Sequence, residues 1–225
     1  MSGKRVRAII VEGFGTLFLS FFVVGASSSY STEQNIATLF LIAIMSAIVL
    51  AVLTVILLPL SGALLNPLLV LWAIFRKDLS LLLGAGVIVL QFAAALLGAF
   101  LANYFFSTKS LEISNVASLE FSQYLLALIF AFGLVFIVAS IRKLDFNANA
   151  AFLLPGWLFI SIIFSEGTST ANPALTVARI FSEGVLEINP MSALFITAAE
   201  IIGAFTAFLV AIYIYGYKLK KIKLK

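Results

Sequence analysis

The sequence predicts an all-α integral membrane protein with six transmembrane helices and two re-entrant half-helices. Three observations lead to this prediction. Hydrophobic residues make up 63% of the 225 residues and charged residues only 11%, whereas a soluble domain carries about 25% charged residues. Six apolar stretches are long enough to cross a bilayer, which takes about 20 residues. Two further apolar stretches are too short to cross it, and each begins with Asn-Pro.

The six long stretches are the predicted membrane spans. They cover residues 8–27, 36–58, 80–105, 121–140, 148–165 and 191–215, and the two short stretches lie near 66–75 and 172–182. The first span follows basic residues, as the apolar part of a secretory signal does. However, Glu12 interrupts its apolar residues and no Ala-x-Ala cleavage pattern follows. We therefore expect this segment to remain in the protein as a span.

Basic residues are distributed unevenly between the loops. With six spans, both termini lie on the same side of the membrane. That side holds 12 of the 14 basic residues: Lys4, Arg5, Arg7, Arg76, Lys77, Arg142, Lys143, Lys218, Lys220, Lys221, Lys223 and Lys225. The opposite loops hold Glu33, Glu112, Glu120, Glu166, Glu183 and Glu187, with only Lys109 and Arg179. The positive-inside rule places both termini in the cytoplasm, and we expect the cell (inner) membrane as the location. We interpret the basic tail, residues 218–225, as a topology signal that contacts lipid headgroups and not nucleic acid.

Cysteine and histidine are both absent from the sequence. Their absence excludes disulfides, thiolate or histidine metal sites, and Ser-His-Asp catalysis. The sequence also shows no nucleophile with a base to activate it. We therefore expect a protein that is not an enzyme and that holds no metal or cofactor.

The two halves of the sequence resemble each other. Residues 61–71 read Ser-Gly-Ala-Leu-Leu-Asn-Pro-Leu-Leu-Val-Leu, and residues 168–178 read Thr-Ser-Thr-Ala-Asn-Pro-Ala-Leu-Thr-Val-Ala. In each half this segment lies between the second and third spans. Because three spans are an odd number, the second half enters the membrane from the opposite side. We therefore predict one membrane channel domain, residues 1–225, built from inverted repeats at about 1–107 and 118–217.

The two Asn-Pro pairs predict a polar site in the middle of the membrane. Asn-Pro alone is an ordinary helix start, because Asn is favoured as the N-cap and Pro at the first helical position. Half-helices at matched places in inverted repeats differ from such ordinary helix starts, because their N-termini meet at the midplane. There they present unpaired N–H groups and partial positive charge. Asn66 and Asn172 would each cap a half-helix and offer an N–H group to a solute, and Pro67 and Pro173 cost no hydrogen bond there. The segments before them offer carbonyl acceptors, so the arrangement suits small neutral solutes and repels cations.

These residues resemble the aquaporin, or major intrinsic protein, family. The matching motifs are Glu12-x-x-Gly15-Thr16, Ser61-Gly62-Ala63-x-x-Asn66-Pro67, Asn172-Pro173-Ala174 and the pairs Gly98-Ala99 and Gly203-Ala204. The resemblance covers nearly the whole chain and implies a homotetramer with one pore per subunit. It also implies that Glu12 braces a re-entrant segment by accepting its backbone N–H groups. The corresponding brace of the second half is expected near Gln123, 49 residues before Asn172.

The sequence departs from the family pattern at positions that select the solute. Leu68 stands where the first motif usually has Ala, and Leu175 stands where Arg usually follows the second motif. Counting from the two Asn residues places the four positions of the family's narrow filter at Ser46, Ile160, Ser169 and Leu175. Such a filter is wide, uncharged and partly apolar, as in some bacterial members linked to arsenical permeation. The resemblance therefore implies glycerol, urea or metalloid hydroxides such as arsenous acid as solutes, together with water.

One arginine lies near the predicted filter. Arg179 is four residues past Leu175, on the same helix face and about 6 Å further along the axis, and Glu183 is four residues beyond it. We interpret Arg179 and Glu183 as an ion pair at the outer mouth that anchors the half-helix. The alternative is that Arg179 supplies the charge that the filter lacks.

A second class of function remains open at this point. Carboxylates inside a membrane are costly and usually functional, and Glu12 and Glu200 are the two candidates. Glu200 lies three residues before Gly203, and we expect it to form a hydrogen bond at a helix interface. Because inverted repeats with broken helices also build transporters, the alternative to a passive channel is a proton-coupled secondary transporter that uses Glu12 or Glu200.

Overall fold

The structure, a computed structural model, describes residues 3–29, 35–106 and 113–217. Within these ranges the chain is helical: α1 (Gly3–Ser29), α2 (Ile36–Ser61), α3 (Pro67–Phe75), α4 (Leu81–Phe106), α5 (Phe121–Leu144), α6 (Ala150–Phe164), α7 (Pro173–Ala178) and α8 (Pro190–Tyr215), with 3₁₀ turns η1 (Asn147–Asn149) and η2 (Arg179–Phe181). The predicted basic tail and the predicted loop residues Glu33, Lys109 and Glu112 lie outside the described residues.

The predicted membrane fold is confirmed. Six of the described helical segments are long and apolar enough to cross a membrane, the shortest of them being the 18 residues Asn147–Phe164. The two predicted short stretches form α3 and the α7–η2 segment. Most of the helices extend beyond the predicted apolar stretch, because polar residues at the membrane surface continue the backbone hydrogen bonding.

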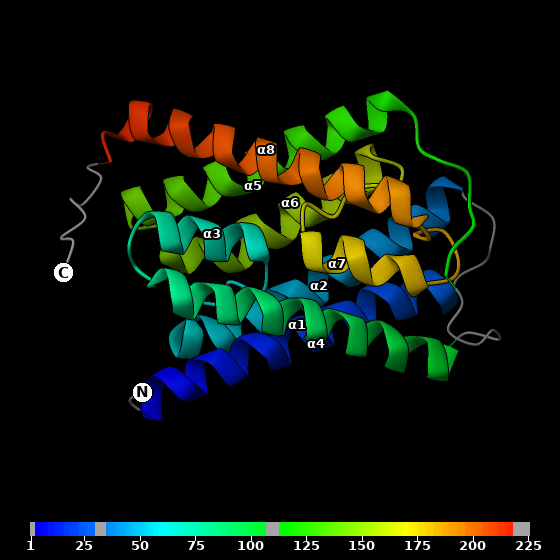
Figure 1. Ribbon diagram of the computed structural model, residues 1–225, viewed down its shortest axis with the longest axis horizontal. Helices are drawn as coiled ribbons and strands as arrows, with labels where there is room; N and C mark the ends of the chain where they lie inside the picture. The colour runs from blue at the N-terminus through cyan, green and yellow to red at the C-terminus, as the bar shows by residue number, and fades with distance from the viewer. Residues whose placement is uncertain (1–2, 30–34, 107–112, 218–225) are drawn as a thin grey trace.

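The two half-helices lie end to end between two layers of long helices, with α5 and α8 on one side and α1 and α4 on the other (Figure 1). In each half, the first long helix packs on the third, α1 on α4 and α5 on α8. A glycine lies at each contact: a Cβ atom on Gly98 would meet the backbone oxygen of Leu17, and one on Gly203 that of Leu128. These glycines therefore let the helix backbones approach closely, as small residues do in membrane proteins.

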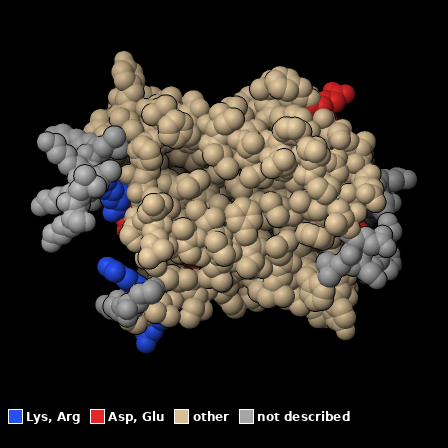
Figure 2. All heavy atoms as spheres, in the orientation of Figure 1, with Lys and Arg blue, Asp and Glu red and all other residues tan. Residues whose placement is uncertain are grey.

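The outer surface of the bundle is apolar over most of its length. Large hydrophobic side chains such as Leu82 and Phe152 are almost fully exposed, and Figure 2 shows a broad band without charged side chains between the two ends of the molecule. Such a band needs lipid around it. The beginning of α1 and the end of α8 lie at one end of the bundle, here called the terminal end (Figure 1).

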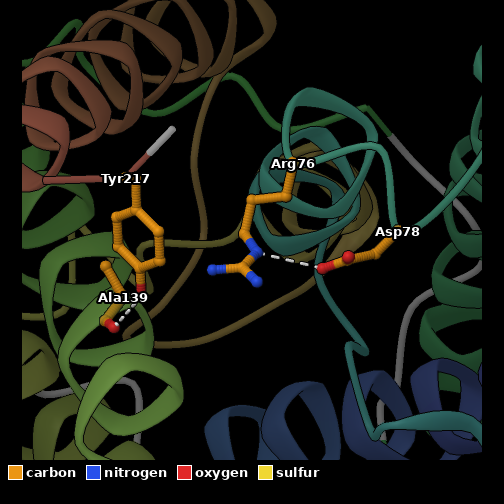
Figure 3. Close-up of polar contacts among 4 residues, drawn as sticks. All are labelled: Arg76, Asp78, Ala139 and Tyr217. Carbon is orange, nitrogen blue, oxygen red and sulfur yellow. Dashed lines mark hydrogen bonds and ion pairs between the residues drawn. The ribbon is translucent and has the colours of Figure 1, made fainter. Parts of the chain in front are cut away.

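A cluster at the terminal end fastens α8 to α3 and α5 (Figure 3). The Tyr217 hydroxyl donates a hydrogen bond to the Ala139 carbonyl at 2.6 Å, and the Arg76 guanidinium lies 4.7 Å from the centre of the Tyr217 ring. Arg76 also pairs with Asp78, with Nε and Oδ2 3.0 Å apart. Partial burial raises the pKa of the Tyr217 hydroxyl, although the charge of Arg76 opposes the shift. The hydroxyl therefore stays protonated, and able to donate, at neutral pH.

Candidate functional site

The first re-entrant segment, residues 62–66, descends from the end of α2 to the middle of the bundle. Gly62 takes a left-handed conformation with φ of 95°, and Ala63 and Leu65 each have φ of 46°. A left-handed conformation costs a residue with a side chain about 1–3 kcal/mol and persists only where the surroundings enforce it. The segment therefore needs partners that fix its backbone.

Glu12 on α1 supplies those partners for the first segment. Its Oε1 accepts from Leu64 N at 2.9 Å and from Ser61 Oγ at 2.6 Å. Its Oε2 accepts from Leu65 N at 2.7 Å and from Gln91 Nε2 at 3.2 Å. The side chain is buried, so these four bonds satisfy a carboxylate that has little contact with water. They are the contacts that a brace requires.

The second re-entrant segment, residues 165–172, enters from the other end of the bundle. Glu166, Gly167 and Ala171 have positive φ values of 52°, 82° and 49°. Hydroxyl groups tie this segment to α6: Ser161 Oγ donates to Ser169 O at 2.9 Å, and Ser169 N donates to Ser165 Oγ at 2.9 Å. The first segment depends on a carboxylate, whereas this part of the second depends on serine side chains.

Arg179 holds the outer part of the second segment. Its Nη2 donates to Gly167 O at 2.6 Å, its Nη1 to Thr168 O at 3.1 Å and its Nε to Leu186 O at 2.7 Å. The side chain is only 1% exposed. The prediction of an ion pair with Glu183 at an open mouth is therefore wrong for Arg179: folding of the loop after η2 over the guanidinium buries it and supplies backbone carbonyls as partners.

Glu200 on α8 holds the inner part of the second segment. Its Oε1 accepts from Asn172 N at 3.0 Å, and Thr176 Oγ1 lies 3.3 and 3.4 Å from its two oxygens. Gln123, the predicted brace, lies instead at the start of α5, where its side chain accepts from Glu120 N at 3.3 Å in a capping box. The prediction for Gln123 is wrong because that residue belongs to the first turn of α5, at the end of the bundle.

Asn66 and Asn172 join the two half-helices at the centre. Each side-chain oxygen caps its own half-helix, Asn66 Oδ1 accepting from Leu68 N at 2.9 Å and Asn172 Oδ1 from Ala174 N at 3.1 Å. Each amide nitrogen donates to the opposite segment: Asn66 Nδ2 to Ala171 O at 2.8 Å, and Asn172 Nδ2 to Leu65 O at 3.0 Å. The N-termini of α3 and α7, which begin at Pro67 and Pro173, therefore face each other across a pair of crossed hydrogen bonds.

A small cavity of about 30 Å³ lies beside the two asparagines. Since one water molecule needs about 10–15 Å³ by this measure, the cavity has room for about two. The walls are mostly apolar: Leu19, Leu50, Ala63, Leu64, Leu65, Leu69, Leu134, Leu154, Trp157, Leu158, Ala171 and Leu175. The uncharged polar side chains in the wall belong to Asn66, Asn172 and Thr170, and Trp157 donates its Nε1–H to Phe130 O.

The four predicted filter residues do not all lie in the wall of this cavity. Leu175 lines the cavity, and Ser46 and Ser169 are fully buried. Ile160 is 38% exposed and lies on the outward face of α6, four residues before the exposed Phe164, so its assignment to the filter is wrong. The next residue, Ser161, is buried and bonded to Ser169 O, because a shift of one residue turns a helix by about 100°.

Sequence reasoning missed two residues of the site. Ser161 lies 11 residues before Asn172, one fewer than the count that placed Ile160. Thr170 lies two residues before Asn172, in the segment predicted to offer only backbone carbonyls, and it is the one threonine in the wall of the cavity as the described residues define it. Its place two residues before the second Asn-Pro was the signal that could have identified it.

Comparison with known proteins gives a consistent result. The family model of the major intrinsic protein matches residues 1–170. The aquaglyceroporin AqpS of Rhizobium meliloti (strain 1021) is 33% identical over 205 residues, which cover 89% of this chain and 87% of that protein. Among solved structures, the aquaglyceroporin from Plasmodium falciparum matches with a TM-score of 0.63 over 90% of this chain and 93% of its own. With 18% identity, that structure supports the fold alone.

The family model covers more than half of the chain, and a relative above 30% identity matches most of its length. Six apolar helices and two half-helices that meet at the centre agree with both matches. The chain therefore belongs to the major intrinsic protein family, and it is a membrane channel and not an enzyme.

Proposed function

We propose that this protein is a passive channel for small neutral solutes, with glycerol, urea and metalloid hydroxides such as arsenous acid as candidates, together with water. The observation that carries the proposal is the pair of crossed hydrogen bonds from Asn66 to Ala171 O and from Asn172 to Leu65 O. These bonds set two half-helix N-termini against each other in a mostly apolar cavity. The relative named as an aquaglyceroporin supports the same solute class.

The chemistry of the centre favours neutral solutes over ions. Each asparagine amide has two N–H groups, and one of them is used in the crossed bonds. The second can donate to a solute oxygen. The N-termini of α3 and α7 add partial positive charge, which repels cations. An apolar wall replaces none of an ion's hydration shell, so an ion pays the full cost of losing its water.

We assign the narrow filter to Ser46, Ser161, Ser169 and Leu175. The first three contribute small side chains, and Leu175 contributes an apolar one where the family usually has Arg. This filter carries no charge of its own, and its side chains are smaller than the Arg and aromatic side chains of other members. We therefore expect passage of solutes larger than water.

Orientation and assembly follow from the charges and from the family. Arg5, Arg7 and the basic residues that end α3 and α5 lie at the terminal end, so we place that end in the cytoplasm. We propose the cell (inner) membrane as the location and a homotetramer, each of whose subunits has its own pore, as the assembly.

The contacts of Glu12 and Glu200 favour a channel over a proton-coupled transporter. Both carboxylates accept hydrogen bonds from backbone N–H groups of the re-entrant segments. A carboxylate in that position stabilises a fixed backbone, whereas a coupling site has to release its proton during each cycle.

Stopped-flow light scattering on proteoliposomes tests the proposal. Glycerol, urea and water are compared under matched osmotic gradients, with protein-free liposomes and an Asn172→Leu variant as controls. We expect glycerol and urea to enter much faster than in either control and to stop at equal concentrations inside and outside. Absence of flux in folded protein, or solute accumulation driven by a pH gradient, would contradict a passive channel.

A further inference from the structure

Thr170 carries a side-chain hydroxyl that the fold does not use. The residue is 3% exposed, and its Oγ1 is buried with no hydrogen-bond partner in the part of the chain that the structure describes. A buried hydroxyl without a partner is costly, most of all inside a membrane where water cannot replace the missing bond. Such a group needs an explanation, and a group that binds at this hydroxyl is one.

The neighbouring hydroxyl groups of the same segment all have partners. Thr168 Oγ1 donates to Ser165 O at 2.7 Å, and Ser169 Oγ accepts from Ala171 N at 3.2 Å. Ser165 Oγ donates to Ser161 O at 2.6 Å. Thr170 therefore differs from the other hydroxyl residues of the second re-entrant segment, and it is also the one of them that lines the central cavity.

The position of Thr170 completes the set of polar groups around that cavity. Asn66 and Asn172 each spend the side-chain oxygen on a helix cap and one N–H group on a backbone carbonyl. Each asparagine therefore offers a solute its second N–H group, which is a donor. A threonine hydroxyl can accept as well as donate, so Thr170 adds a side-chain acceptor to a wall whose other side chains are apolar or donors.

We propose that the Thr170 hydroxyl binds the solute as it passes the asparagine pair and thereby determines which solutes cross. This inference rests on the proposed function. The solute class is one that carries an oxygen acceptor together with an O–H or N–H donor on the same small neutral molecule, as polyols, urea and metalloid hydroxides do. The solute oxygen accepts from the free N–H groups of Asn66 and Asn172, and its donor bonds to Thr170 Oγ1.

The same geometry explains how a narrow apolar pore admits a polar solute. With a volume of about 30 Å³, the cavity leaves a passing molecule little accompanying water. A solute that loses its hydration must find replacement hydrogen bonds, since an unpaired polar group is costly to bury. Thr170 supplies one such bond beside the two asparagines, where the backbone carbonyls of Leu65 and Ala171 each already accept one hydrogen bond.

Three substitutions at one position separate this role from a steric one. Thr170→Val keeps the shape and removes the hydroxyl, Thr170→Ala removes the hydroxyl and enlarges the cavity, and Thr170→Ser keeps the hydroxyl in a smaller side chain. Thr54→Val is the matched control, because Thr54 Oγ1 is also buried without a partner among the described residues but Thr54 does not line this cavity. Glycerol and urea permeability are measured by stopped-flow light scattering, and thermal unfolding in detergent checks that each variant is folded.

We expect Thr170→Val and Thr170→Ala to lower glycerol and urea permeability about five- to tenfold, as the loss of one hydrogen bond implies. Thr170→Ser and Thr54→Val should stay within about twofold of the wild type. If Thr170→Val does not fold, the comparison of Thr170→Ala with Thr170→Ser tests the same point: permeability should fall without the hydroxyl in Ala and stay near the wild type with it in Ser. Wild-type rates in the Val or Ala variant would show that the hydroxyl does not control permeation, and faster flux in both Ala and Ser would show that side-chain size does. Either result would overturn the proposal. If the wild-type protein itself shows no solute flux, the proposed function fails, and that result is distinct from a failure of Thr170.

Discussion

Replacing Glu200 tests whether the second intramembrane carboxylate is structural. In Glu200→Leu, the backbone N–H of Asn172 loses its acceptor at 3.0 Å, which costs about 1–3 kcal/mol for a buried donor. The Thr176 hydroxyl loses a longer bond of 3.3–3.4 Å and adds about 1 kcal/mol. The total is about 2–4 kcal/mol. In Glu200→Gln the amide oxygen can still accept from Asn172 N, so we expect a loss of about 1 kcal/mol.

Thermal unfolding of the purified variants in detergent measures these differences. For a chain of this size, 1 kcal/mol corresponds to about 2–4 °C, so Tm should fall by roughly 4–16 °C for Leu and by roughly 2–4 °C for Gln. Glycerol permeability of Glu200→Gln should stay within about twofold of the wild type at both pH 6 and pH 8. A folded Glu200→Gln protein that has lost its flux would refute a structural role and favour proton coupling.

Two further predictions concern charged and aromatic contacts away from the cavity. Arg179→Met removes three hydrogen bonds from a buried cation to Gly167 O, Thr168 O and Leu186 O, each worth about 1.5–3 kcal/mol. We therefore expect poor folding, and a lower Tm for any folded fraction, in a thermal-unfolding assay; an unchanged Tm would contradict this. Tyr217→Ala should lower the free energy of unfolding by about 1–3 kcal/mol, because it removes the contact with Arg76 and the bond to Ala139 O. Tyr217→Phe removes only the hydrogen bond and should lower it by about 1 kcal/mol. The pKa of Tyr217 is raised, so its hydroxyl contributes to stability at neutral pH and loses that contribution only as alkaline pH passes this pKa. The difference in Tm between the wild type and either Tyr217 variant should therefore be the same at pH 6 and pH 8.

Local features of the sequence predicted most of the fold. The length of each apolar stretch decides whether a helix can span a bilayer, so six spans and two half-helices could be predicted from the lengths of these stretches. Asn-Pro fixes where α3 and α7 begin, because the cap and the first helical residue are chosen within two positions. Glu12 could be placed opposite the first segment because its motif and that of the segment both matched a known family.

Only the tertiary structure decided which groups meet at the centre. Gln123 caps the start of α5 through Glu120, three residues away, whereas nothing local indicates that Glu200 bonds to Asn172, 28 residues away. The choice between Ile160 and Ser161 depends on a single residue in a count across a loop, and one residue turns a side chain from an exposed face of α6 to a buried one. The sequence by itself determines apolar stretches and helix caps, because these act over neighbouring residues. The partners of a buried polar group depend instead on distances between segments far apart in the chain, so only the tertiary structure decides them.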